Sequence, residues 1–222
     1  MPTDPRPDAT PLRKKPSQTR ALRTVDTLFE AAARILATEG ESGFTTNRIA
    51  ERAGFSIGTL YQYFPSKEAI VVAMVRRQRE RVMRELDAIL ARTERGEIDV
   101  EEALRHYLRQ LVDAFGRGQK AQRVLARLGW QLDAPALIVQ AMDDGAERIR
   151  AALVRLDDPS LPVPDDATLF VLSRAVMGAV RSAAVEEHPL LDDPAFEDAL
   201  IRLVWGMVRR PLPEGGPAPG QR

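Results

Sequence analysis

Residues Thr45 to Glu68 read TTNRIAERAGFSIGTLYQYFPSKE, and this stretch decides the fold. Two short helical patterns flank a turn at Gly54, where a left-handed backbone conformation costs a glycine little. Ser56 can cap the second helix, and Pro65 stops it. That helix carries small, hydroxyl and aromatic side chains where an ordinary surface helix carries Lys and Glu. The layout predicts a helix-turn-helix whose second helix reads DNA.

The residues of this stretch divide into those that hold the motif together and those that face outward. Ile49, Ala50, Leu60 and Phe64 are predicted to form its interior. Gly58 and its neighbours offer a close backbone approach, hydroxyls and a methyl group to base edges and phosphates. The residues predicted to face DNA are Thr45, Thr46, Asn47, Ser56, Ile57, Gly58, Thr59, Tyr61, Tyr63 and Lys67.

The string from Phe44 to Glu68 resembles the N-terminal signature of the TetR/AcrR family of bacterial regulators. The resemblance runs from the first predicted helix to Ile70, and the remainder is similar only in length and helical layout. It implies a homodimeric repressor that binds a palindromic double-stranded DNA operator and releases it when a small-molecule effector binds the C-terminal domain. It also implies DNA contacts by residues within the stretch, and Gly58, Tyr61 and Lys67 match the family pattern best.

Helical periodicity continues in both directions from the motif, and Gly and Pro residues mark the breaks. Nothing predicts a strand, so the expected fold class is all-α. We expect a three-helix DNA-binding head at residues 19–66, joined by a long helix to a larger ligand-binding and dimerisation domain at residues 67–210. The expected helices span residues 19–39, 45–53, 57–63, 67–92, 100–117, 119–131, 135–156, 165–188 and 194–210.

The two ends of the chain, residues 1–18 and 211–222, are rich in proline and poor in large apolar residues, which predicts disorder. The first end is also basic, although the net charge of the chain is zero. Its cations either extend the DNA contact along phosphates or a minor groove, or form a solvated terminus. The cations concerned are Arg13, Lys14, Lys15, Arg20 and Arg23.

Apolar seams with small residues recur in the last two predicted helices, and they predict the surface on which a second copy binds. A twofold dimer doubles the contacts that one short reading helix makes. The alternative is that these faces pack within one subunit. The predicted interface residues are Leu169, Leu172, Val176, Val180, Ala183, Phe196, Leu200, Leu203, Val204 and Met207.

Aromatic and methionine side chains on the middle helices predict an apolar ligand cavity, with Gln131 or Arg174 orienting the ligand. An ordinary core is the alternative for each of them. Arg127, Arg174 or Arg181 would indicate an anionic ligand if it were buried. The predicted lining residues are Tyr107, Leu111, Phe115, Leu128, Trp130, Gln131, Met142, Phe170, Arg174 and Met177.

Other classes of protein find little support in the sequence. The chain has no cysteine, two histidines and none of the common phosphate-loop, serine-hydrolase or zinc-protease motifs, so we expect no enzyme, metal site or cofactor. It has neither a signal peptide nor an apolar run long enough for a membrane span, which favours the cytoplasm. A ligand-independent architectural DNA-binding protein stays an alternative that the zero net charge disfavours, and a helical enzyme is a weaker one.

Overall fold

The computed structural model describes residues 19–132 and 135–208, and throughout these ranges the chain forms helices and no strand. The predicted all-α class is confirmed. The predicted tails, with Arg13, Lys14 and Lys15, lie outside these ranges. The elements are α1 (Thr19–Thr38), α2 (Thr46–Ala53), α3 (Ile57–Tyr63), α4 (Lys67–Glu94), α5 (Val100–Ala114), α6 (Lys120–Gln131), α7 (Pro135–Leu156), α8 (Asp166–Val185), the short 3-10 helix η1 (Pro189–Asp192) and α9 (Pro194–Val208).

Side-chain caps explain where the helices begin. Ser56 accepts a hydrogen bond from the backbone N–H of Thr59, and Ser66 accepts one from that of Ala69. Thr45, Asp99 and Asp165 cap α2, α5 and α8 in the same way. Each such cap stabilises its helix by about 1 kcal/mol.

Two predicted helices end earlier than expected. The helix predicted to run to residue 117 ends at Ala114, because Gly116 and Gly118 adopt positive φ values of 103° and 64°. The helix predicted to run to residue 188 ends at Val185. Glu187 has a φ of 52°, and Pro189 then starts the short helix η1, which the sequence reading missed.

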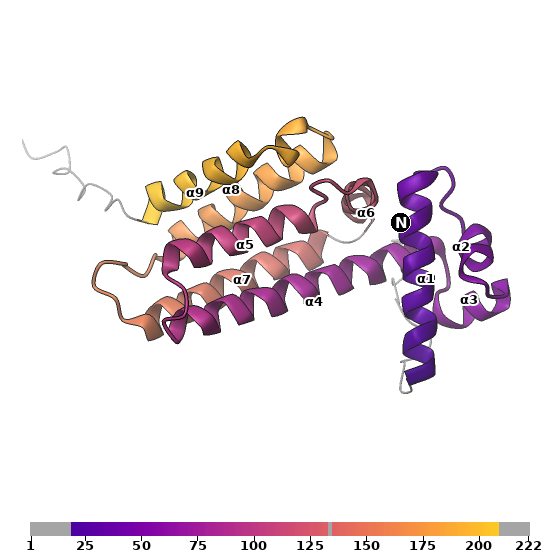
Figure 1. Ribbon diagram of the computed structural model, residues 1–222, viewed down its shortest axis with the longest axis horizontal. Helices are drawn as coiled ribbons and strands as arrows, with labels where there is room; N and C mark the ends of the chain where they lie inside the picture. Colours follow the sequence, from indigo (N-terminus) through magenta and orange to yellow (C-terminus); the bar gives the residue numbers. More distant parts are fainter. Residues whose placement is uncertain (1–18, 133–134, 209–222) are drawn as a thin grey trace, which may run out of the picture.

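The molecule is elongated, with a compact head at one end (Figure 1). α1 crosses the N-terminal end of α4, and α2 and α3 lie on its outer side. α4, α5, α7, α8 and α9 extend away from the head as a bundle, and α6 lies between that bundle and α1. The long helix α4 therefore belongs to both parts.

The hydrophobic core of the head does not stop at the end of α3. Ile49, Ala50, Leu60 and Phe64 are buried, as predicted. They share one cluster with the first two turns of α4, including Ile70, and with buried residues of α6. The α6 members are Val124, Leu125 and Leu128. The division of the chain at residue 66 stays a prediction.

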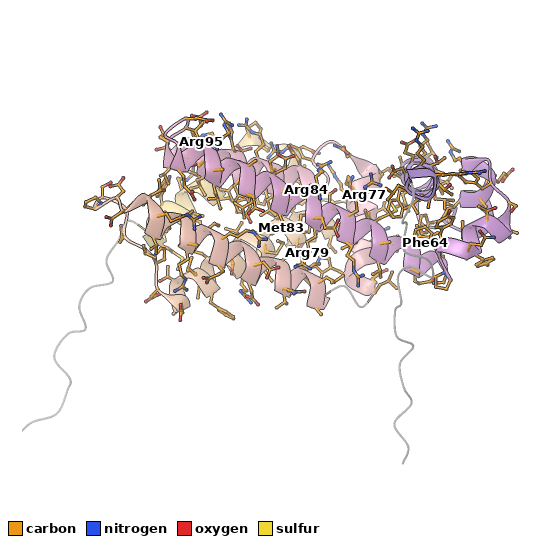
Figure 2. The ribbon with its side chains drawn as sticks, turned by 90° about the horizontal axis from the view of Figure 1, so that it is seen from below. Phe64, Arg77, Arg79, Met83, Arg84 and Arg95 are labelled. Carbon is orange, nitrogen blue, oxygen red and sulfur yellow. The ribbon has the colours of Figure 1, made fainter. Side chains whose placement is uncertain are left out.

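Ion pairs between α4 and α7 fasten one side of the bundle. Arg148 pairs with Asp87 at 2.9 Å, and Arg79 pairs with Asp144 at 2.5 Å. Figure 2 shows α4 and α7 side by side, with Arg79 and Met83 between them. Exposed pairs of this kind stabilise a fold by about 1 kcal/mol at most. Their main effect is therefore to fix the position of α7 along α4.

Glu197 is the one charged side chain that α9 buries, with 5% of its surface exposed. Arg117 donates to its Oε2 at 3.0 and 3.1 Å, and Arg109 donates to its Oε1 at 3.2 Å. The two arginines come from α5 and from the turn that follows it. Glu197 therefore ties both to α9.

Replacing Glu197 by alanine is expected to lower the free energy of unfolding by about 2 kcal/mol, because two guanidinium groups lose their shared carboxylate. Urea denaturation measures the change. Glu101→Ala is the control, since Glu101 is exposed and makes a long contact of 3.8 Å with Arg105. Equal losses in the two variants would show that burial gives Glu197 no special role.

Candidate DNA interface and ligand cavity

The turn between α2 and α3 is held by backbone hydrogen bonds. Gly54 has a φ of 73°, and its N–H points to the carbonyl oxygens of Ala50 and Glu51. The N–H of Phe55 donates to Ala50 at 2.9 Å. A residue with a side chain at position 54 would be strained at this φ, so the glycine fixes the angle between the two helices.

Hydroxyl groups gather on one surface of this motif. The Thr46 Oγ1 and the Tyr61 hydroxyl lie 3.3 Å apart, although 15 residues separate them in sequence. The Ser56 Oγ accepts from the Thr59 N–H at 3.1 Å and lies 2.9 Å from the Thr59 Oγ1. The sequence predicted these four residues individually but not their contacts. One pair joins α2 to α3, and the other lies at the start of α3.

The predicted DNA-facing residues differ in how far they reach solvent. Tyr61 is 42% exposed and Ile57 is 37% exposed, so both large side chains offer surface to a partner. Tyr63 is half-buried and packs against the core of the head, so it offers DNA less surface than Tyr61. Thr46 and Thr59 are also half-buried. The exposed members are Thr45, Asn47, Ser56, Ile57, Gly58, Tyr61 and Lys67.

Gly58 has room for a side chain within the protein. A Cβ atom placed there would meet only the Ser56 Oγ, at 3.8 Å. Its φ lies outside the left-handed region. Neither packing nor backbone strain within the described chain therefore requires a glycine at this point of an exposed helix.

Positive charge around the motif lies at its edges. Arg48 pairs with Glu39 and Glu51, both at 3.1 Å, and these hydrogen bonds, Glu39 first, raise its pKa above the usual range. Arg52 also pairs with Glu39. Lys67 is exposed at the start of α4, and among the described residues it has no acidic partner. It can therefore meet a phosphate without breaking an ion pair.

An apolar cavity of about 260 Å³ lies within the bundle. Its wall follows α4 from Val75 to Thr93 and α7 from Leu137 to Leu156. At 1.5 Å per residue these stretches are each about 27–29 Å long. α5, α6, α8 and α9 close the remaining sides. The space is long, narrow and close to the lower end of the volume range of ligand sites.

Six of the ten predicted pocket residues line this cavity, and four do not. The six are Tyr107, Leu111, Phe115, Trp130, Met142 and Met177. Of the four, Leu128 packs in the core of the head, and Gln131 is exposed at the end of α6. Phe170 is 58% exposed, and the Arg174 guanidinium stacks on it at 4.1 Å while pairing with Asp143. These four assignments are corrected accordingly.

None of the three arginines considered for an anionic ligand is buried. Arg127 pairs with Glu41 and Glu187, and the exposed Arg181 lies over the ring of Trp130, 4.7 Å from its centroid. The sequence reading instead missed the wall that α4 supplies, including Arg79 and Met83. The sequence did carry a signal for this wall. From Val75 onward, the lining residues of α4 recur three and four positions apart, but the helix was interpreted only as a connector.

Tyr107 lies near the middle of the cavity. Its hydroxyl oxygen is 3.6 Å from the place that a Cβ on Gly145 would occupy, so the absent side chain gives it room. Burial raises the pKa of Tyr107 to about 12. The hydroxyl therefore stays protonated at physiological pH and has no hydrogen-bond partner among the described residues.

The predicted dimer seam mostly faces the inside of the subunit. Leu169, Leu172, Val176, Val180, Ala183 and Leu200 are buried in the isolated chain. Phe196 and Val204 pack against the same cluster from α9, and only Leu203 and Met207 keep substantial surface. The assignment of the buried residues to a contact with a second copy is wrong, because they already contact their own subunit.

The outward face of α8 and α9 carries other apolar residues. Phe170 is 58% exposed, Val171 48% and Leu203 37%. Open space surrounds Gly178 and Gly206 on these helices. α8 is the single described helix that is long and apolar enough to cross a membrane by composition, and one third of that window is buried. These three side chains thus leave apolar area exposed to solvent on α8 and α9.

Part of the head and the start of α4 match a known family, and most of the chain matches solved structures. Residues 28–74 match the family model described as bacterial regulatory proteins, tetR family. Two uncharacterised HTH-type transcriptional regulators of Mycobacterium tuberculosis, strains CDC 1551 and H37Rv, are each 37% identical over 70 residues. That match covers 32% of this chain, and it spans about a third of the relatives' own length (35%).

Solved structures resemble the chain over most of its length. A protein from a study of the control of antibiotic production by bacterial hormones superposes with a TM-score of 0.64 and 24% identity, over 85% of this chain and 99% of that one. SmeT, the repressor of the multidrug efflux pump SmeDEF of Stenotrophomonas maltophilia, superposes with a TM-score of 0.62 and 20% identity. The match covers 84% of this chain and 90% of SmeT. AibR in complex with isovaleryl coenzyme A and operator DNA superposes with a TM-score of 0.54 and 19% identity. The match covers 85% of this chain and 100% of AibR. At these identities the likeness shows a shared fold.

Proposed function

We propose that the chain is a member of the tetR family of bacterial regulatory proteins, whose model matches residues 28–74, and that it is a homodimeric repressor of transcription. It binds a palindromic DNA operator and releases it when a small molecule occupies the cavity of the bundle. The observation that carries the proposal is the pairing of an exposed hydroxyl-rich helix α3 with a separate apolar cavity, joined by α4. An architectural DNA-binding protein needs no such cavity. We assign no catalytic role and place the protein in the cytoplasm.

In this proposal α3 enters the major groove. Thr59 and Tyr61 contact base edges or phosphates, and Lys67 meets a phosphate at the start of α4. Arg20 and Arg23 lie on α1 and can add phosphate contacts. The two α3 helices of a dimer then lie about 34–36 Å apart, so that they meet successive grooves on one face of the duplex.

The second copy binds the outward face of α8 and α9. Phe170, Val171 and Leu203 supply apolar area, and Gly178 and Gly206 allow the helices of two copies to approach closely. Four helices packed in this way form a small bundle between the subunits. This surface replaces the buried seam that the sequence suggested.

Two helices carry the signal from cavity to head. α4 begins in the head core at Ile70 and lines the cavity from Val75 onward. α6 touches α4 so closely that a Cβ on Gly129 would lie 2.9 Å from the Val75 Cγ2. A ligand that pushes α4 and α6 apart binds best to a dimer with one spacing between the heads of its two subunits. DNA binds best to a dimer with another spacing. By linkage, each then weakens the binding of the other.

The Gly58→Ala variant tests the DNA-binding role of α3. Because the added methyl group meets no clash in the protein, we expect unchanged or slightly higher thermal stability. Against DNA the methyl group occupies the closest point of approach, and we expect affinity for the protein's own promoter fragment to fall about tenfold or more. Fluorescence anisotropy measures the affinity, and Ser42→Ala in the exposed α1–α2 loop is the control.

Two results would overturn this role. The first is wild-type protein that binds the promoter fragment no better than unrelated DNA of equal length. The second is a Gly58→Ala variant with wild-type affinity. Binding that does not weaken as salt rises would also contradict the phosphate contacts.

A further inference from the structure

The charge, shape and hydrogen-bond donors of the cavity wall indicate which class of small molecule it can bind. Resting on the proposed function, we infer that the effector is an uncharged, elongated and mainly apolar molecule. It carries a hydrogen-bond acceptor, such as a ketone or ester oxygen, that the Tyr107 hydroxyl binds at mid-length of the cavity.

The charge of the wall excludes an ionic effector. Among the described residues, Arg79 is the single charged side chain that lines the cavity. Asp144 pairs with it at 2.5 Å, and the Gln140 Oε1 accepts from it at 3.4 Å. The cavity therefore presents no net charge to a ligand. A cation would find no carboxylate on the wall, and an anion would have to displace Asp144, so either would be buried without a counter-ion.

The shape of the cavity calls for a chain. Its wall is about 27 Å long on α4, and apolar residues line each end, with Val75 and Leu125 near the head and Leu161 at the far end. A compact polycyclic molecule would leave one end of so narrow a space empty. An extended alkyl chain fills it, and each methylene that enters the cavity is expected to tighten binding about fourfold.

Tyr107 supplies the polar contact at the middle of the cavity. Its hydroxyl lies beside Gly145 of α7 and near Met83 and Leu86 of α4, which are apolar neighbours. The other two hydroxyls of the wall already donate to carbonyl oxygens of their own helices, Thr93 to Ile89 and Ser173 to Phe170.

An unpaired donor in an apolar space is costly, and an acceptor on the ligand removes that cost. The Trp130 Nε1 also has no hydrogen-bond partner, but it is fully enclosed, so a ligand in the cavity does not reach it. Among the hydroxyls of the described wall, that of Tyr107 is the one without a partner.

The chain carries its own reporter of cavity occupancy. It contains two tryptophans, and both Trp130 and Trp205 line the cavity. A ligand that enters must change the surroundings of at least one indole ring. Intrinsic tryptophan fluorescence of the full chain therefore follows binding without any DNA.

The test compares four molecules of equal chain length: 5-nonanone, nonane, nonanoate and nonyltrimethylammonium. Each is titrated into wild-type protein and into Tyr107→Phe. We expect 5-nonanone to bind tightest, and Tyr107→Phe to weaken its binding about five- to tenfold while leaving nonane unchanged. Ser42→Ala, which removes a hydroxyl from the exposed α1–α2 loop, should leave all four affinities unchanged. The series 4-heptanone, 5-nonanone and 6-undecanone tests the gain per methylene.

Three results would overturn the inference. They are tighter binding of nonanoate or of nonyltrimethylammonium than of the ketone, a Tyr107→Phe variant with undiminished ketone affinity, and no fluorescence response to any ketone. Ketone binding that leaves operator affinity unchanged would support the effector class and overturn the release step of the proposed function. A wild-type protein that does not bind the operator even without ligand would overturn the proposed function, whereas the ketone titrations would still decide the ligand class of the cavity.

Discussion

The double variant Thr59→Ala, Tyr61→Ala is expected to lose operator affinity by about a hundredfold or more while it stays a folded dimer. Each base or phosphate contact of this kind contributes about 1–3 kcal/mol, and a dimer loses both contacts twice. The fold should tolerate the change, because Tyr61 is 42% exposed and its recorded partner is the Thr46 hydroxyl at 3.3 Å. Thr59 gives up its side-chain contact with Ser56, whereas the backbone cap of α3 remains.

Anisotropy with promoter DNA and thermal unfolding are measured on the same samples. Thr38→Ala is the matched control, since Thr38 is an exposed threonine at the end of α1 whose hydroxyl donates to the carbonyl oxygen of Arg34. Normal operator binding by the double variant would show that α3 is not the reading helix. A large drop in the melting temperature would instead assign Thr59 and Tyr61 to the structure of the head.

The Val171→Arg variant is expected to convert the dimer to a monomer and, as a result, to abolish specific operator binding. Val171 is 48% exposed on α8, so an arginine there harms the fold of the single subunit little. In a dimer the same position would bring two unpaired guanidinium groups together across the twofold axis. Burying such charges costs several kcal/mol, which is enough to separate the subunits at micromolar concentration.

Light scattering coupled to size-exclusion chromatography gives the mass of each variant. Val154→Arg is the matched control, because Val154 is a valine on α7 that is 59% exposed, somewhat more than Val171. We expect Val154→Arg to stay dimeric and to bind DNA as the wild type does. A Val171→Arg protein that elutes as a dimer would place the interface on another face.

The sequence predicted the helices well because their ends are set by local chemistry. Ser56, Ser66 and Asp165 cap helices within their own segments, and Gly116 and Gly118 end one. The interior of the head followed from the spacing of apolar residues. What the sequence did not predict is contact across space, such as that between the Thr46 and Tyr61 hydroxyls.

The proposed dimer face shows what an apolar sequence pattern leaves open. α8 is apolar around most of its circumference, so the sequence does not show which side faces the subunit interior and which faces outward. Val176 and Val171 are the same residue type on the same helix, yet Val176 is 7% exposed and Val171 is 48% exposed. The cavity wall on α4 was missed for a related reason: its lining residues also look like ordinary core.

Helix α6 is shared between two tasks, and this limits how the protein can change. One side of it, with Val124 and Leu128, completes the interior of the DNA-binding head, while Ala126 and Trp130 form part of the cavity wall. A substitution that reshapes the cavity through α6 therefore also disturbs the head. The cavity-lining residues of α5, α7, α8 and α9 lie outside that shared core, so under the proposed function ligand preference can diverge there while operator recognition is kept.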